Sequence, residues 1–241
     1  MPLVPSTVSE MGGVIPAFTL MPSLPPVGTR RPIKARDSQW AAATAKILAR
    51  SGLRPNQISI LSAVFAAFSG VCFAASVYVS KPWMVAAFFM GAAACVQLRL
   101  LCNLFDGMVA VEGGFRTKSG EIFNELPDRF ADAFTLVGCG YAASLTRYGV
   151  ELGWIAALLA VITAYVRTLG AATGAGQSFI GPMAKQHRMA TVTVASLLGA
   201  GAAFFSWQGE VMRVALAIIV LGTIVTIFRR VGWVIRTLEA K

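Results

Sequence analysis

Four polar side chains with ligand oxygens recur at helical spacing in an otherwise apolar part of the chain. Asn103 and Asp106 lie three residues apart, and Asn124 and Asp128 lie four residues apart. Residues at such spacings share one face of a helix. Carboxylate and amide oxygens are ligands that Mg²⁺, Mn²⁺ and Ca²⁺ prefer. The pattern therefore predicts a site for a divalent cation, which would neutralise a phosphate-bearing ligand and assist its displacement.

The two pairs are expected to meet because only a short loop, near residues 112–119, separates the helices that carry them. Helices joined by a short loop pack antiparallel. Unpaired carboxylates within a membrane are costly, so the acids need a cation or a polar cavity. Small residues beside them leave room for a ligand with phosphates: Gly107, Ala110 and Gly120. A helix pair held by buried polar contacts is the structural alternative.

The elements that would position this site are membrane-spanning helices. The chain has 241 residues, of which 56% are hydrophobic and only 13% are charged, whereas a soluble domain carries about 25% charged residues. Long apolar runs indicate spanning helices. We predict an all-α integral membrane bundle of six transmembrane helices over residues 57–80, 83–111, 120–146, 152–175, 189–208 and 211–228.

The first part of the chain is expected to lie outside the bilayer. Residues 1–34 read as a disordered, Pro-rich basic tail, and residues 35–241 as the membrane domain. Within that domain, residues 37–51 are predicted to form an amphipathic helix on the membrane surface, with one apolar stripe of Trp40, Ala43, Ile47 and Leu48. The N-terminal pattern does not predict a signal peptide, and the four cysteines have no metal-site or disulfide spacing.

The net charge is +10, and the basic residues are distributed unevenly between the two sides of the predicted topology. If the N-terminus is cytoplasmic, basic residues gather on the cytoplasmic side, and the opposite side has only Lys81, Arg147 and Arg213. This asymmetry predicts cytoplasmic termini and an acidic site at the cytoplasmic face of a bacterial inner membrane or its equivalent. It favours contact with anionic membrane lipids rather than with nucleic acid.

The spacing of the acidic stretch resembles a family motif. From Asn103 to Asp128 the chain reads N-x2-D-G-x2-A-V-x8-G-x3-N-x3-D. This line is similar to the D-x2-D-G-x2-A-R-x8-G-x3-D-x3-D motif of the CDP-alcohol phosphotransferases, also called CDP-alcohol phosphatidyltransferases, with every gap length kept. The segment RPNQIS, residues 54–59, is similar to the family's TPN-x2-T. The resemblance covers most of residues 35–241.

The resemblance implies a metal-dependent transferase of phospholipid biosynthesis that is expected to be a homodimer. It implies transfer of a phosphatidyl group from CDP-diacylglycerol to a small polar hydroxyl acceptor, with release of CMP. Asp128 would be the general base that deprotonates the acceptor. The other implied roles are metal ligation of Mg²⁺ or Mn²⁺ by Asn103, Asp106, Asn124 and Asp128, and nucleotide binding by Gly107, Ala110 and Gly120.

The chain departs from the family motif at three positions. Asn103 and Asn124 stand where the family has Asp, which removes two negative charges. An amide oxygen is a weaker metal ligand than a carboxylate, so we expect one ion to be held more firmly than two. Val111 replaces the family's Arg, and Arg99, one turn before Asn103, is interpreted as a partial substitute for a lost charge. Glu112 and Glu121 are further candidate ligands.

A second, basic cluster is predicted to face the same cytoplasmic cavity. Arg167 lies late in the fourth predicted span, and Lys185, His187 and Arg188 lie in the Gly-rich loop that follows it. In the resembling family this region helps to bind the acceptor, and Lys and Arg suit a phosphate such as that of glycerol phosphate or inositol phosphate. Ordinary basic residues of the cytoplasmic side are the alternative.

Three other functions remain open from the sequence. The first is transfer of phosphocholine or phosphoethanolamine from a soluble CDP-alcohol to diacylglycerol. The second is a catalytically degenerate binder of CDP-lipid, since two of the motif's acids are Asn. A transporter is disfavoured because the acids cluster at one face of the membrane rather than near its midplane.

Overall fold

The computed structural model describes residues 38–114 and 120–240, and this part of the chain is helical without a strand. The predicted tail over residues 1–34 lies outside the described residues. The helices are α1 (Gln39–Arg50), α2 (Pro55–Ala75), η2 (Ser76–Tyr78), α3 (Pro82–Glu112), α4 (Gly120–Ala142), α5 (Gly149–Ala172), α6 (Lys185–Ala202), η3 (Ala203–Phe205) and α7 (Gln208–Glu239). The prediction of an all-α fold is confirmed for these residues.

Five segments are long and apolar enough to cross a membrane: Pro55–Tyr78, Pro82–Val111, Gly149–Ala172, Lys185–Phe205 and Gln208–Glu239. They match five of the six predicted spans, and they are consistent with a membrane helical bundle. The sixth predicted span corresponds to α4, which has 23 residues but carries Glu125, Asp128, Arg129 and Asp132. Its crossing of the membrane stays a prediction.

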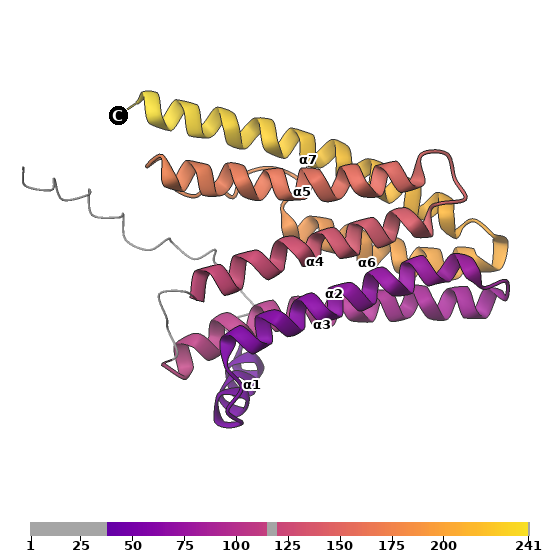
Figure 1. Cartoon of the computed structure of the whole chain (residues 1–241), viewed down its shortest axis with the longest axis horizontal. Helices are drawn as coiled ribbons and strands as arrows, with labels where there is room; N and C mark the ends of the chain where they lie inside the picture. Colours follow the sequence, from indigo (N-terminus) through magenta and orange to yellow (C-terminus); the bar gives the residue numbers. More distant parts are fainter. Residues whose placement is uncertain (1–37, 115–119, 241) are drawn as a thin grey trace, which may run out of the picture.

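The six long helices form a ring in the order α3, α2, α4, α5, α7, α6 and back to α3. Figure 1 shows these helices running side by side, with the beginnings of α2 and α4 and the ends of α3, α5 and α7 at one end of the bundle. The sequence predicted that α3 and α4 pack on each other, but both pack chiefly against α2, which lies between them. The facing sides of α3 and α4 are therefore both turned toward the inside of the ring.

Helix α1 runs across the bundle at the same end and contacts α3 (Figure 1). Ala41 and Ala45 are fully buried there, and the Trp40 ring meets Phe105 edge-on at 6.1 Å between centroids. Trp40 and Ile47, from the predicted apolar stripe, are exposed. A helix with one face on the protein and an apolar stripe outside suits the membrane surface, and this placement stays a prediction.

Glycines let α4 approach its two neighbours closely. A Cβ on Gly138 of α4 would overlap the Cα of Gly70 in α2, and a Cβ on Gly140 would lie 2.9 Å from the Cα of Gly153 in α5. Small residues at helix contacts are how membrane helices gain van der Waals packing. These contacts fix the position of α4, and with it the position of the acids that α4 carries.

Gly138→Ala is expected to destabilise the protein by about 1–3 kcal/mol, because the added methyl group forces α2 and α4 apart. Gly201→Ala is the matched control, since nothing lies within 4 Å of a Cβ at that helical position. Thermal unfolding in detergent measures both. Equal midpoints for the two variants would show that the α2–α4 contact is looser than the structure has it.

Candidate active site

Side chains from five helices gather at one end of the bundle. They come from the last turns of α3, the beginning of α4, the end of α5 and the first turn of α6, with Ser59 added from α2. This is the end at which α1 lies (Figure 1). The ring thus brings together chemical groups that are far apart in the sequence.

Asp106 of α3 is buried and bound to α2. Its Oδ2 accepts a hydrogen bond of 2.8 Å from the Ser59 hydroxyl, and both side chains are at most 5% exposed. The Gly107 amide also donates to the carboxylate. These donors fix the orientation of the carboxylate. Ser59 was not predicted as a site residue, although it ends the RPNQIS segment.

Asp128 of α4 lies within electrostatic range of Asp106. The two carboxylates are near enough for their charges to interact, and the Lys185 ammonium acts on both. Lys185 forms an ion pair of 2.6 Å with Asp128 Oδ1, and both side chains are only partly buried. The two carboxylates of the family motif that survive in this chain are therefore brought together.

The two Asn side chains differ in their surroundings. Asn103 of α3 is half-buried, and its amide nitrogen is buried with no hydrogen-bond partner in the described part of the chain. An unpaired buried polar atom costs free energy, so this side chain is suited to meet a ligand. Asn124 of α4 is exposed. Burial therefore favours Asn103 over Asn124 as a side chain that meets a bound ligand.

Three small residues lie on the same helix ends as these groups. Gly107, Ala110 and Gly120 are each half-buried, at the end of α3 and at the first residue of α4. The backbone of Glu112 ends α3 and that of Glu121 follows Gly120, while the side chains of both glutamates lie outside the described part. Nucleotide binding by the three small residues and metal ligation by the two glutamates stay predictions.

The described residues alone do not form a metal cage, because no group of three or more His, Cys, Asp or Glu side chains among them is placed to hold an ion. Mg²⁺, however, is commonly bound by one or two carboxylates together with substrate phosphates. Asp106 and Asp128 fit the carboxylate part of such a site, and the unpaired Nδ2 of Asn103, a hydrogen-bond donor, suits a substrate phosphate oxygen. They fit a cation that arrives with, or is completed by, a phosphate-bearing substrate.

The predicted basic residues are paired with acids of α4. Arg167 of α5 forms an ion pair with Glu125, whose carboxylate also accepts a 2.9 Å hydrogen bond from Arg129. The Arg167 guanidinium lies 5.6 Å from the centre of the Phe179 ring. His187 is exposed. The acids Glu125, Asp128 and Asp132 thus present a row of carboxylates to the cations of α5 and α6.

A fully buried ion cluster lies one turn deeper. Asp132 accepts from Arg99 through one carboxylate oxygen and from Arg188, at 2.8 Å, through the other. The exposed fractions are 0% for Arg99, 1% for Asp132 and 3% for Arg188. Arg188 also donates to the Met183 carbonyl at 3.1 Å. This cluster joins α3, α4 and α6 beneath the Asp128–Lys185 pair.

Pairing with Asp132 gives Arg99 a structural role that the sequence did not indicate. We predicted that Arg99 stands in for a lost metal charge or for the family's Arg. Its guanidinium meets Asp132 and, at 3.1 Å, the Met189 sulfur. A buried arginine needs such a partner whatever its function. Electrostatic support of the site by Arg99 stays a prediction.

The sequence of the chain is similar to that of a known protein. No protein-family model matches the chain. An uncharacterized protein of Aquifex aeolicus (strain VF5) is 28% identical over 146 residues, which are 60% of this chain and 68% of that protein.

The chain is also similar to crystal structures of phosphatidylinositol phosphate synthase from Mycobacterium tuberculosis. The structure with CDP-DAG bound has a TM-score of 0.66 at 20% identity, over 82% of this chain and 94% of that one. The complex with manganese and citrate has a TM-score of 0.64 at 20% identity, over 80% and 88%. The apo form has a TM-score of 0.61 at 21% identity, over 80% and 94%. At this identity the likeness establishes the fold, and the chain has the helical fold of these synthase structures.

Proposed function

We propose that this protein is a membrane CDP-alcohol phosphotransferase. It would transfer a phosphatidyl group from CDP-diacylglycerol to a hydroxyl acceptor, release CMP, and serve phospholipid biosynthesis. The observation that carries the proposal is that Asp106 and Asp128, which keep the motif spacing, lie within electrostatic range of each other and of Lys185. The shared fold with a synthase crystallised with CDP-DAG supports the choice of donor.

In this proposal a divalent cation is held by Asp106, Asp128 and Asn103, with Asn124 as a further, weaker ligand. Bound there, Mg²⁺ or Mn²⁺ would neutralise the pyrophosphate and stabilise negative charge that develops on it. The manganese complex of the synthase supports the use of such an ion. Ser59 holds the Asp106 carboxylate in place through its 2.8 Å hydrogen bond. Gly107, Ala110 and Gly120 leave space for the nucleotide.

Asp128 is the proposed general base. Its carboxylate takes the proton of the acceptor hydroxyl, and the oxygen attacks the phosphorus that carries the diacylglycerol. A bond from acceptor oxygen to phosphorus forms while the bond to the bridging pyrophosphate oxygen breaks, and that oxygen leaves with CMP. Asp128 is only partly buried, so an acceptor can approach it from the cytoplasmic side of the ring.

Lys185 connects the base with the acceptor. In this structure its ammonium neutralises Asp128 at 2.6 Å. An acceptor with its own phosphate offers Lys185 a second anion and brings its hydroxyl toward the carboxylate. Arg167, also partly exposed, is a further phosphate contact. Arg188 stays a predicted acceptor contact, although its guanidinium faces Asp132 here.

Lys185→Met is expected to lower kcat/KM for a phosphorylated acceptor by about 10–100-fold, chiefly through KM, because a charge-assisted contact is lost. Assays of CMP release with glycerol phosphate or inositol phosphate measure this. Lys81→Met, an exposed lysine before α3, is the control. An unchanged KM in Lys185→Met would exclude Lys185 from acceptor binding.

The proposed topology has six spans, with α4 as the third, and cytoplasmic termini. The active site then opens at the cytoplasmic face of a bacterial inner membrane or its equivalent. Helix α1 lies on that face, and the protein is proposed to be a homodimer. The basic residues at the ends of the helices support this orientation.

The choice of donor separates the proposal from its nearest rival. CMP release is measured with CDP-diacylglycerol and, separately, with CDP-choline or CDP-ethanolamine plus diacylglycerol. Release with CDP-diacylglycerol alone is the expected result. Release that needs a soluble CDP-alcohol would assign the rival transfer. Tight CDP-diacylglycerol binding without turnover would make the protein a catalytically degenerate binder. Asn103 and Asn124, which replace two acids of the motif, would then explain the lost activity.

A further inference from the structure

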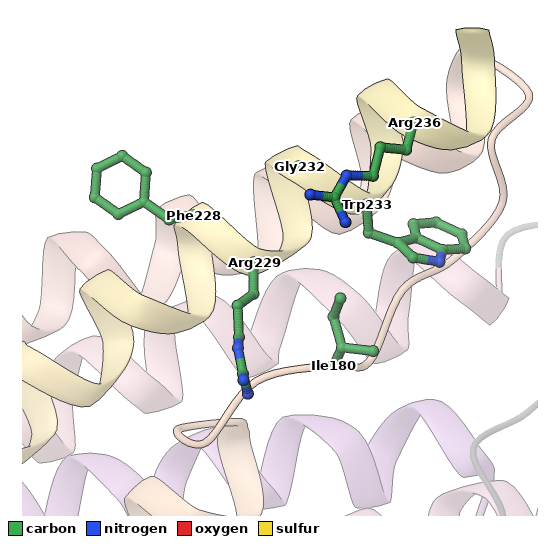
Figure 2. Close-up of a pocket in the computed structure, with 6 residues that line it drawn as sticks. All are labelled: Ile180, Phe228, Arg229, Gly232, Trp233 and Arg236. Atoms are coloured by element: carbon green, nitrogen blue, oxygen red, sulfur yellow. The ribbon is translucent and has the colours of Figure 1, made fainter. Parts of the chain in front are cut away.

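A groove lies at the end of α7, and none of the described acids of α3 and α4 lines it. It is lined by Ile180, Phe228, Arg229, Gly232, Trp233 and Arg236, and its volume is about 460 Å³. Figure 2 shows Arg229 reaching from α7 toward the segment that carries Ile180, while the Arg236 guanidinium folds back along the helix. The groove thus combines two cations with apolar walls.

The groove is expected to lie at headgroup depth. Helix α7 has 32 residues, and at 1.5 Å per residue it is about 48 Å long. About 20 residues cross the hydrocarbon core. If α7 enters the bilayer near Gln208, the core ends near Phe228, and Arg229 to Arg236 extend into the headgroups. This step rests on the topology given under the proposed function.

The two arginines are placed for an anion from outside the protein. Arg229 and Arg236 are seven residues apart, so they lie two turns apart on one side of α7. Both are exposed, and neither is in an ion pair with another described residue. Their neighbour Arg230 differs, because it is buried and donates to the carbonyls of Ile180 and Thr163. The exposed pair is therefore distinct from the arginine that holds the segment 177–182 to α7.

Gly232 keeps the wall between the arginines open. It lies inside α7, where glycine is less favourable than alanine by about 1 kcal/mol, and a Cβ there would meet nothing within 4 Å. The Trp233 side chain is half-buried beside it, and tryptophan is enriched at membrane interfaces. Together these residues form an open, apolar surface flanked by two guanidinium groups.

We propose that this groove binds an anionic glycerophospholipid of the cytoplasmic leaflet. The Arg229 and Arg236 guanidinium groups bind its phosphate, and Ile180, Phe228 and Trp233 contact its glycerol and upper acyl carbons. Guanidinium groups suit phosphate oxygens, and basic residues at the membrane surface attract acidic lipids. Apolar walls favour a lipid over a free phosphate as the occupant.

The test measures lipid retention on the purified, full-length protein by native mass spectrometry. Phosphatidylglycerol and phosphatidylcholine with the same acyl chains are titrated separately. The double variant Arg229→Gln/Arg236→Gln is compared with Arg147→Gln/Arg213→Gln, which removes the same charge from one exposed and one partly exposed side chain elsewhere. Loss of two surface cations is expected to weaken phosphatidylglycerol binding about 30-fold in the first variant and to leave the control unchanged.

Gly232→Leu tests the shape of the groove without a change of charge. The side chain is expected to fill the open wall and to weaken phosphatidylglycerol binding at least tenfold, while the helix remains stable. Equal binding losses in the two double variants would overturn the proposal, as would equal retention of phosphatidylcholine. Full competition by inorganic phosphate would overturn it in favour of a soluble anion.

This readout is independent of catalysis. Lipid retention is measured without CDP-diacylglycerol, metal or acceptor, so an absence of CMP release leaves the result intact. Conversely, a groove that binds no lipid leaves the transferase proposal intact, because Arg229 and Arg236 lie outside the proposed catalytic site.

Discussion

Replacement of Asp128 by Asn is expected to lower the turnover number for CMP release by about 10²–10⁴-fold, the usual contribution of a general base. The amide keeps the size of the side chain but cannot take a proton from the acceptor hydroxyl. It also removes one of the two carboxylates that face the proposed cation. Binding of CDP-diacylglycerol should weaken much less than turnover.

The control for this prediction is Glu151→Gln, an equivalent change at an exposed site in the first turn of α5. It should retain full activity. Steady-state CMP release gives the turnover number, and a parallel binding measurement gives the affinity for CDP-diacylglycerol. A turnover number for Asp128→Asn within tenfold of the unaltered protein would remove Asp128 from the role of base.

Asp132→Ala is expected to destabilise the fold by about 3–5 kcal/mol, because it leaves the buried guanidinium groups of Arg99 and Arg188 without their anion. In a chain of this length the midpoint of thermal unfolding should fall by roughly 6–20 °C. Asp132→Asn should lower the free energy of unfolding by less, since the amide oxygen still accepts one hydrogen bond. Unfolding is followed in detergent by loss of monodisperse protein.

Glu210→Ala is the matched control, since Glu210 pairs with Arg213 at an exposed position. An exposed pair contributes about 0–1 kcal/mol, so its midpoint should hardly change. If Asp132→Ala and Glu210→Ala unfold at the same temperature, the buried cluster does not hold α3, α4 and α6 together.

Periodicity in the sequence predicted which residues share a helix face. The spacing of Asn103 and Asp106, and of Asn124 and Asp128, places each pair on one side of its helix, and the structure brings Asp106 and Asp128 near each other. Apolar length likewise predicted where the helices lie. These properties are local, so a single sequence is sufficient to indicate them.

The partners of the charged residues could not be predicted. Asp132 pairs with Arg99 and Arg188, which are 33 and 56 residues away in the chain. The order of helices in the ring decides which of these distant residues meet, and that order depends on close glycine contacts such as Gly70–Gly138. The same reason explains why α2 lies between α3 and α4 although a short loop joins the latter two.

The apolar pattern also did not predict where α7 ends. The predicted span stopped at residue 228, where Arg229 and Arg230 lower the hydropathy, but the helix continues to Glu239. Hydropathy marks the length of chain that prefers hydrocarbon, whereas helix propensity and packing decide where the helix ends. The groove with Arg229 and Arg236 lies in that extension.

The most direct test of the central claim is acceptor-dependent CMP release by the purified protein in lipid. The assay contains CDP-diacylglycerol, Mg²⁺ or Mn²⁺, and one acceptor at a time from a panel of phosphorylated and unphosphorylated polyols. CMP and a new phospholipid are expected in equal amounts, only when acceptor and metal are both present. Absence of CMP with every acceptor and either metal, while CDP-diacylglycerol still binds, would contradict it and make the protein a binder of CDP-lipid.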